Sequence, residues 1–438
     1  MRTALFMTRG HFAMKLLTFI RQRSYARYVM VDLTDAARRL GWAVKWLDLE
    51  GVLEAARDRS PDEKARVVSE TLADIERYDP RLIFSYGLEY LDRVFQDALP
   101  DVRTRFHELL KRPAVYYLCD FGFPFDSESS PEALDFIAPL QDWGSLLLCW
   151  DREATEVVKR TGVTKTSYLP MAVNERMFYP DYEIQAEAPI SALFVGGPTA
   201  ERISLLESVA DLGLVIHGYD AARWQASEQL RQRYQGEILE RDPLRAVYQR
   251  ARISINVTRA HGPSSLNMRV YEAMACGSLL LTDDKSDART LFAEGTQIVT
   301  YRDPDDLRRK VRYYLTHETE RAAIAAAGME KVRQSHTYAA RLRSVAPTLR
   351  KFDTECSLFG KLREFLVQDP AQAVRFVRFL EVERLITLNQ DNLRLMEARA
   401  HLALGDTGQA DMCLTDVLEL NPKHLNAEAL RREIREAA

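Results

Sequence analysis

The residues best suited to carry out chemistry lie between Ser264 and Asp284, in the sequence SSLNMRVYEAMACGSLLLTDD. Helical spacing from Asn267 to Cys276 places Glu272 about one turn beyond Arg269. A carboxylate in this position can accept the two hydroxyls of a ribose, while an arginine and a helix N-terminus can hold an anionic diphosphate. The segment therefore predicts a nucleotide site, although a lone glutamate on a helix more often belongs to a solvated face.

Two adjacent carboxylates, Asp283 and Asp284, follow the buried parallel strand that is predicted over Ser278–Thr282. We interpret them as strand-end groups or as neighbours of a bound sugar.

The elements that must position these residues begin with a first lobe. Short apolar runs alternate there with amphipathic segments, which is typical of parallel strands joined by crossover helices. Helical spacing covers Tyr25–Leu40, Asp62–Arg77 and Leu88–Lys111. Strands are predicted over Thr3–Met7, Ala43–Asp48, Leu82–Ser85, Ala114–Leu118, Ser145–Leu148 and Thr166–Leu169. The pattern predicts a doubly wound, Rossmann-like lobe over residues 1–180.

A second lobe follows a break in which Pro170, Pro180 and Pro189 interrupt both periodicities. The alternation then restarts with the apolar runs ISALFV, LVIH, ISINV, SLLLT and QIVTY. We predict a second Rossmann-like lobe over residues 181–345. Because ligands bind at the carboxyl ends of parallel strands and at domain interfaces, the region between the lobes is the expected ligand site.

The remaining residues, 346–438, have helical spacing and no convincing strand. Within them, HLALGDTGQADMCLTDVLELNP has small residues and a terminating proline where a tetratricopeptide helix pair needs them: Gly405, Ala410, Leu414, Val417 and Pro422. A single repeat cannot bury its own face, so this segment should pack on its neighbour or on another molecule. The fold class is therefore α/β, with two Rossmann-like lobes and a helical, TPR-like C-terminal segment.

Composition limits the class of protein. Of 438 residues, 46% are hydrophobic and 28% are charged, which is ordinary for a globular protein that works in water. The net charge of −4 argues against a general nucleic-acid binder. No segment resembles a signal peptide or a membrane span. Five cysteines lack metal-ligand spacing, which predicts reduced thiols, no metal site and a cytoplasmic location.

The second lobe resembles a known group of proteins. Its R-x-x-E-A-x-A-C-G sequence, from Arg269 to Gly277, is similar to that of GT-B glycosyltransferases, most closely the spore-maturation CgeB-like branch. The similarity extends through GTQIVTYRDPDDLRRKVRYYL to HTYAARL, and LFVGGPTAERISLL and LPMAVNERMFYP also fit the family.

This resemblance implies roles for individual residues. Glu272 would bind the donor ribose, and Arg202 and Arg269 would contact the diphosphate. Gly196 and Gly197 would let the phosphates approach the backbone, although paired glycines also form ordinary turns. Gly218 and Asn267 complete the predicted donor-binding set. Related retaining enzymes carry a second glutamate eight residues before the ribose glutamate, where this chain has Ser264.

Two residues of the first lobe are candidate catalytic groups. His11 follows the first predicted strand, and a histidine there can act as a base or contact the acceptor. Asp120 closes the strand AVYYLCD at its carboxyl end, where doubly wound folds present functional groups. His11 is equally well explained as a loop residue without a role.

The predicted function is sugar transfer from a nucleotide diphosphate sugar to a protein or glycan acceptor, with no metal or cofactor. In such a reaction, positive side chains and helix dipoles stabilise the leaving diphosphate. The alternatives are a non-catalytic scaffold with a vestigial nucleotide pocket and a two-lobe sugar-phosphate epimerase, since one architecture hosts several chemistries. The helical segment favours a polypeptide partner or dimerisation.

Overall fold

The computed structural model describes residues 14–20, 26–48, 60–86, 113–118, 137–181, 188–237, 240–258 and 262–437. Its contacts divide the chain into two compact units. Unit 1 contains residues 1–149, 154–168 and 344–438, and unit 2 contains residues 150–153 and 169–343.

The sheet of unit 1 has six described strands, all parallel. Their order is β2-β1-β3-β4-β5-β6, with bounds β1 Lys15–Ile20, β2 Ala43–Asp48, β3 Leu82–Tyr86, β4 Ala114–Leu118, β5 Ser145–Cys149 and β6 Thr166–Tyr168. Five of the six predicted strands are confirmed. The sixth, Thr3–Met7, lies outside the described residues, and β1 was not predicted.

Three described helices connect these strands: α2 Ala26–Arg39, α4 Pro61–Tyr78 and α8 Arg152–Arg160. Helix α4 starts where Ser60 meets Glu63, whose carboxylate accepts hydrogen bonds from the Ser60 amide and hydroxyl. Proline at its first position needs no amide partner there. The predicted helices over Tyr25–Leu40 and Asp62–Arg77 are confirmed to within two residues, and Leu88–Lys111 lies outside the described residues.

The sheet of unit 2 has five described strands, again all parallel. Their order is β11-β10-β9-β7-β8, with bounds β7 Ile190–Val195, β8 Leu214–His217, β9 Ala251–Asn256, β10 Leu279–Asp283 and β11 Val299–Tyr301. Because β7 pairs with both β8 and β9, the strand order reverses between β7 and β9. This reversal is the switch point at which doubly wound folds bind ligands.

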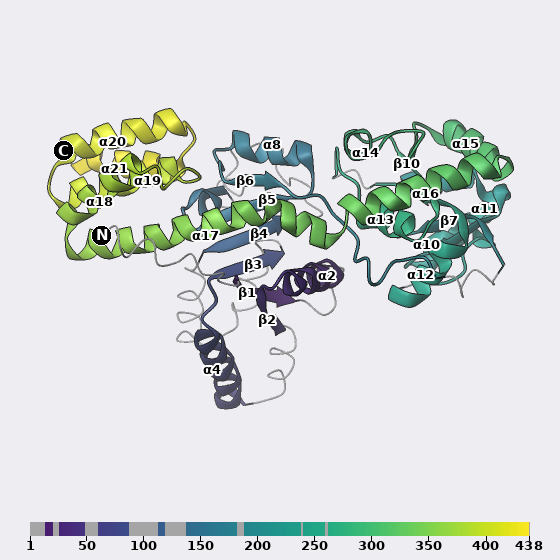
Figure 1. Cartoon of the computed structure of the whole chain (residues 1–438), viewed down its shortest axis with the longest axis horizontal. Coiled ribbons are helices and arrows are strands. Elements are labelled where there is room, and N and C mark those ends of the chain that lie inside the picture. The colour runs from purple at the N-terminus through teal and green to yellow at the C-terminus, as the bar shows by residue number, and fades with distance from the viewer. Residues whose placement is uncertain are drawn as a thin grey trace. The chain divides into compact units, whose positions relative to one another are not determined.

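Helices cover the second sheet (Figure 1). The described helices are α9 Ala200–Glu207, α10 Ala221–Ala226, α11 Glu228–Arg231, α12 Arg241–Arg250, α13 Met268–Ala275, α14 Ser286–Leu291, α15 Pro304–Thr316 and α16 Glu318–Ser335, with a short 3₁₀ turn at Ala210–Leu212. Alternate strand residues such as Phe194, Ile255 and Leu281 form one core with α9, α10 and α15. Helices α12, α13 and α16 also pack on the strands. Both predicted doubly wound sheets are thus confirmed.

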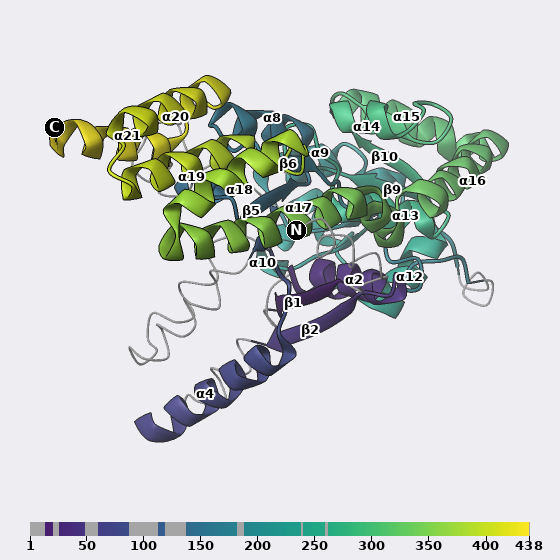
Figure 2. The same ribbon diagram turned by 60° about the vertical axis from the view of Figure 1, so that its left-hand side comes forward.

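The C-terminal region is helical, as predicted, with bounds α17 Tyr338–Gln368, α18 Pro370–Val382, α19 Gln390–Ala403, α20 Thr407–Leu420 and α21 Leu425–Ala437. Helices α19 and α20 lie side by side (Figures 1 and 2). The chain turns between them at Gly405, whose φ of +79° favours glycine. Ala410, Leu414 and Val417 are fully buried. The tetratricopeptide assignment itself stays a prediction.

From Ser344 onward these helices are part of unit 1, where they pack against residues around its sheet. The ring of Trp143 stacks on Phe359 of α17 with centroids 5.5 Å apart. The buried amide of Gln141 donates to the Lys423 carbonyl at 2.7 Å and accepts from the Leu425 amide at 2.8 Å. From the sequence, the first lobe was predicted to end at residue 180 and residues 346–438 to form a separate segment. The structure instead places residues 344–438 in the same compact unit as the first sheet.

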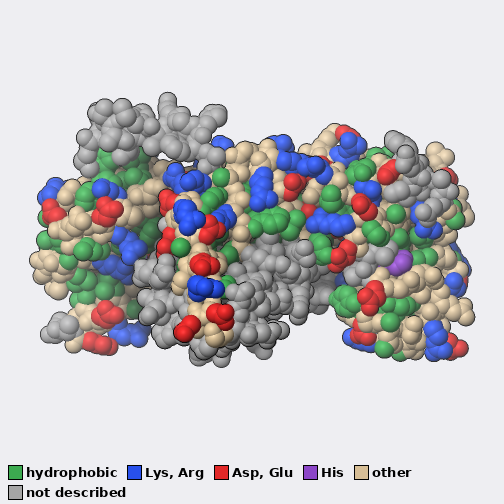
Figure 3. Space-filling view, turned by 90° about the horizontal axis from the view of Figure 1, so that it is seen from below, with side chains coloured by type: hydrophobic (Ala, Val, Ile, Leu, Met, Phe, Trp, Pro, Cys, Tyr) green, Lys and Arg blue, Asp and Glu red, His purple; other side chains and the backbone are tan. Residues whose placement is uncertain are grey.

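Three further findings bear on the class of protein. Within the described ranges, no helix has the length and apolar character needed to cross a membrane. Basic and acidic side chains are interspersed on the face shown in Figure 3. Four cysteines, Cys149, Cys276, Cys356 and Cys413, are buried and free, while Cys119 lies outside the described residues.

Candidate functional site

The switch point of unit 2 brings together the predicted glycines. Gly196 and Gly197 directly follow β7, and Gly218 directly follows β8. A Cβ atom on Gly218 would lie 2.1 Å from the Gly196 carbonyl oxygen, and one on Gly197 would lie 2.1 Å from the Tyr219 ring. Position 218 therefore requires glycine, because the two backbone turns approach each other too closely there for any side chain. At position 197 the neighbour is the Tyr219 side chain, which would have to move.

Arg202 spans the switch point from the first turn of α9. Its guanidinium donates to the Gly197 carbonyl at 3.0 Å, after β7, and to the Val257 carbonyl at 2.6 Å, after β9. The side chain is buried and lies over the Phe194 ring, 5.6 Å from its centroid. Arg202 was predicted to contact the diphosphate. In this structure it holds together the two loops that flank the switch point and gives their carbonyl edge a positive charge.

Helix α13 starts next to the same loops. The Asn267 side chain accepts a hydrogen bond from the Arg269 amide at 3.0 Å and donates to the Asn256 side chain at 2.9 Å. Asn256, at the end of β9, also donates to the Thr282 hydroxyl at 2.9 Å. Asn267 therefore caps the helix while tying its N-terminus to the carboxyl ends of β9 and β10.

Arg269 and Glu272 lie together on α13, as their spacing predicted. The Arg269 guanidinium donates to the Glu272 carboxylate at 2.9 Å. The Glu272 residue is only 1% exposed, although carboxylates rarely lie this deep without partners. The solvated-face interpretation of Glu272 is therefore wrong, because burial of a carboxylate costs free energy unless charges and donors compensate it.

Asp283 also lies at this edge of the sheet. One of its carboxylate oxygens accepts from the Thr258 amide at 2.9 Å and from its hydroxyl at 3.1 Å. Its neighbour Asp284 lies 3.3 Å from the Arg289 guanidinium. The interpretation of these carboxylates as strand-end groups agrees with these contacts.

Sequence reasoning missed Asp151, which is 1% exposed. Its carboxylate accepts hydrogen bonds from the Ser264 amide and hydroxyl, at 3.0 and 2.8 Å, and from the Ser265 amide at 3.0 Å. The Ser264 hydroxyl in turn accepts from the Arg152 and Glu153 amides. Asp151 follows strand β5 by two residues, and this position at a strand's carboxyl end was the one available signal.

Asp151 fixes the loop that leads into α13. Ser264 stands at the position where the family resemblance led us to look for a sugar-binding glutamate, and its hydroxyl donates to Asp151. The carboxylate thus orders the backbone immediately before the helix that holds Arg269 and Glu272.

The two catalytic candidates of the first lobe, His11 and Asp120, lie outside the described residues. They stay predictions.

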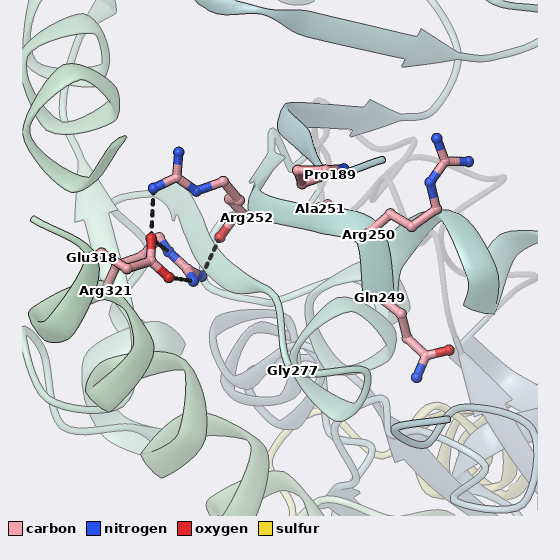
Figure 4. Close-up of a pocket in the computed structure, with 8 residues that line it drawn as sticks. All are labelled: Pro189, Gln249, Arg250, Ala251, Arg252, Gly277, Glu318 and Arg321. Atoms are coloured by element: carbon pink, nitrogen blue, oxygen red, sulfur yellow. Dashed lines mark hydrogen bonds and ion pairs between the residues drawn. The ribbon is translucent and has the colours of Figure 1, made fainter. Parts of the chain in front are cut away.

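A separate pocket of unit 2, of about 590 Å³, is lined by none of these residues (Figure 4). Pro189, Ala251 and Gly277 line it, and each of them stands at the amino end of a strand. Its Arg252 and Arg321 side chains both donate to Glu318, which holds the pKa of that carboxyl down at about 2. Because functional groups of doubly wound folds lie at the carboxyl ends, this pocket is not the switch-point site.

The switch-point residues can hold an anion next to a polar group. Two strands end in glycine turns that open the backbone, α13 directs its N-terminus toward the same edge, and two arginines supply positive charge. A buried glutamate lies one turn along the helix. This combination suits a nucleotide with a diphosphate and a ribose.

The second lobe matches a known family in sequence. Residues 202–346 match the model of a family described as glycosyl transferase-like. The matched range includes Arg202, Asn267, Arg269 and Glu272. Comparison with curated proteins finds no match.

Solved structures share the fold. HepE from Anabaena, crystallised with UDP-glucose, is 15% identical, covers 77% of this chain and 99% of its own, and has a TM-score of 0.55. Sucrose-phosphate synthase from Thermosynechococcus elongatus is 14% identical, covers 77% and 98%, and has a TM-score of 0.54. A glycosyltransferase from Rickettsia africae is 11% identical, covers 78% and 99%, and has a TM-score of 0.52. The chain therefore has two Rossmann-like lobes of the GT-B fold, as predicted.

Proposed function

We propose that this protein is a glycosyltransferase that moves a sugar from a nucleoside diphosphate sugar to an acceptor. The observation that carries the proposal is the switch point of unit 2. There Arg202 joins the loops after β7 and β9, and α13 presents Arg269 and the buried Glu272 beside them. The family match over residues 202–346 supports the same chemistry.

Each group has a role in this proposal. Glu272 accepts the ribose hydroxyls, while Arg269 and the N-terminus of α13 bind the diphosphate and stabilise the negative charge that develops on it as the glycosidic bond breaks. Arg202 keeps Gly196 and Gly197 open to the phosphates. Asp120 or His11 of the first lobe acts as the base that takes the acceptor proton.

Uridine diphosphate is the first nucleotide to test, because HepE was crystallised with UDP-glucose. The proposed reaction needs no divalent metal, since arginines and a helix N-terminus supply the positive charge. We also propose a CgeB-like enzyme with a TPR-like segment that contacts a protein or glycan acceptor.

Slow hydrolysis of the donor tests this proposal without knowledge of the acceptor. The protein is incubated with UDP-glucose in EDTA, and released UDP and sugar are followed by chromatography and NMR. We expect slow release of UDP together with free sugar, and loss of release in Glu272→Gln. Change of sugar configuration without net hydrolysis would indicate an epimerase, and no turnover with any nucleotide sugar would favour the scaffold.

A further inference from the structure

Three side chains of the C-terminal helices form a cluster that the proposed reaction does not use. Glu397 and His401 lie on α19, and Cys413 lies on α20. One carboxylate oxygen, one imidazole nitrogen and the sulfur atom all lie within 4.8 Å of one another. Residues four apart share one face of a helix, so the backbone of α19 directs Glu397 and His401 toward the same point on α20.

The cluster has the chemistry of a zinc site. Zinc takes sulfur, imidazole and carboxylate ligands at 2.0–2.3 Å, so that two ligand atoms of a tetrahedral site lie about 3.5 Å apart. The three atoms would have to approach by about 1 Å, which side-chain rotation supplies. Arg394 donates to one of the Glu397 carboxylate oxygens, at 2.6 Å, and the Cys413 thiol also hydrogen-bonds to this carboxylate. A bound metal would take the place of the thiol proton between the two groups.

The surroundings of the cluster carry excess negative charge. The Arg394 guanidinium faces three carboxylates, at 2.8 Å from Glu381, 2.6 Å from Glu397 and 3.8 Å from Asp416. Burial and the charges of Glu397 and Asp416 raise the pKa of Glu381, while Arg394 and Arg378 act in the opposite direction. These two arginines do not neutralise three carboxylates, so a further cation is favoured at this position.

His401 has a further carboxylate near its ring. Its Nδ1 atom lies 4.0 Å from the Asp406 carboxylate. Histidines that bind metals commonly direct their second ring nitrogen toward a carboxylate, which fixes the ring and leaves the first nitrogen as the ligand. Asp406 places a carboxylate near this ring nitrogen at the turn between α19 and α20, and 4.0 Å is longer than a hydrogen bond.

We propose that Glu397, His401 and Cys413 bind one zinc ion, with water as the fourth ligand, and that this ion joins α19 to α20. On binding, the Cys413 thiol releases its proton to solvent and the thiolate bonds to the metal. The site is structural, and it is separate from the switch point of unit 2. The spacing of cysteines along the chain predicted no metal site, because these ligands come from two different helices and form no paired cysteine or histidine motif.

Metal content tests the proposal. Untagged full-length protein is expressed with zinc, dialysed, and measured by elemental mass spectrometry. We expect about one zinc per chain, and a loss of at least about tenfold in affinity in Cys413→Ser and in His401→Gln. The matched control is His317→Gln, which removes an exposed histidine at the end of α15 and should retain zinc.

Cobalt provides an independent readout of the ligands. Protein treated with EDTA and titrated with Co²⁺ should develop a sulfur-to-cobalt charge-transfer band that Cys413→Ser lacks. Circular dichroism shows whether each variant is folded. If Cys413→Ser does not fold, His401→Gln is used in its place. Zinc content below one-tenth per chain, or equal zinc content in wild type and a folded His401→Gln protein, would overturn the proposal.

Discussion

At the scale of single residues, the switch point depends on close approach of two backbone turns. Gly196 and Gly218 meet where β7 and β8 end, and the Cβ of any side chain at position 218 would overlap the Gly196 carbonyl. The Arg202 guanidinium donates a hydrogen bond to the carbonyl of the next residue, Gly197. The same few atoms therefore determine both the packing and the phosphate approach that we propose.

Gly218→Ala tests this dependence. We expect destabilisation of about 1–3 kcal/mol, because the added methyl group has backbone rather than a flexible side chain beside it. Nucleotide affinity should fall as well, since the Gly196 turn must move. Urea unfolding and calorimetric titration with UDP measure the two effects.

The matched control is Gly360→Ala on α17, where nothing lies within 4 Å of the added atom. It should leave nucleotide binding unchanged and stabilise the helix by up to about 1 kcal/mol. Equal stability of Gly218→Ala and wild type would contradict the steric argument.

At the scale of elements, His336 joins three helices of unit 2. Its Nδ1 atom accepts from Arg341 of α17 at 2.7 Å, and Nε2 lies 3.3 Å from the Leu291 carbonyl at the end of α14. Residue 336 itself ends α16. Burial, and then the positive charge of Arg341, lower the pKa of His336 to about 3.

This pKa makes stability depend on pH. An unfolded histidine has a pKa of about 6.5. Below that pH the unfolded chain therefore binds a proton that the folded chain does not bind. The stability that the neutral, buried His336 gives the fold is fully present above pH ~6.5. It is lost as pH falls toward ~3, by up to about 1.4 kcal/mol per pH unit. Urea unfolding between pH 7 and pH 5 should show a smaller decrease in His336→Gln than in wild type. An unchanged slope in that variant, with His317→Gln as the exposed control, would refute this role.

Elements were more predictable from sequence than the site. Strands such as Ala43–Asp48 and Ala114–Leu118 have the predicted bounds because short apolar runs with clear breaks determine them locally. Strand β1 was missed because its KLLTFI run lies beside a second candidate, TALFM, and local pattern does not choose between them. Glu272 and Arg269 were found from helical spacing, whereas Asp151 acts on a loop more than 100 residues away in sequence and only the folded chain brings them together.

At the scale of the whole molecule, the C-terminal helices from Ser344 onward belong to the same compact unit as the first sheet. Gln141 beside β5 bonds to Lys423 and Leu425, and Asn421 donates to the Gly162 carbonyl at 2.9 Å. Glu355 of α17 is fully buried and accepts from the amides of Thr387 and Leu388. These contacts indicate that sheet and tail unfold together.

Ending the chain after Gln368 tests this interdependence. Removal of α18–α21 exposes Phe359 and Leu362, which these helices cover, and it removes the Lys423 and Leu425 partners of Gln141. We expect a lower melting temperature for unit 1 and increased proteolysis. In the full chain, Gln141→Leu should cost about 1–3 kcal/mol, because it leaves buried backbone groups unpaired, while the exposed control Gln409→Leu should be neutral. A truncated protein that melts like wild type would show that the tail is independent.

Direct binding of nucleotides to the wild-type protein and to Glu272→Gln tests the central proposal most directly. Calorimetric titration with UDP, GDP, dTDP and CMP, each with and without EDTA, gives the affinity and the metal dependence together. We predict selective binding of one nucleotide, unaffected by EDTA and weakened at least tenfold, or about 1.4 kcal/mol, in a folded Glu272→Gln protein. Absence of binding by every nucleotide, or equal affinity of the two proteins, would contradict the assignment of this site.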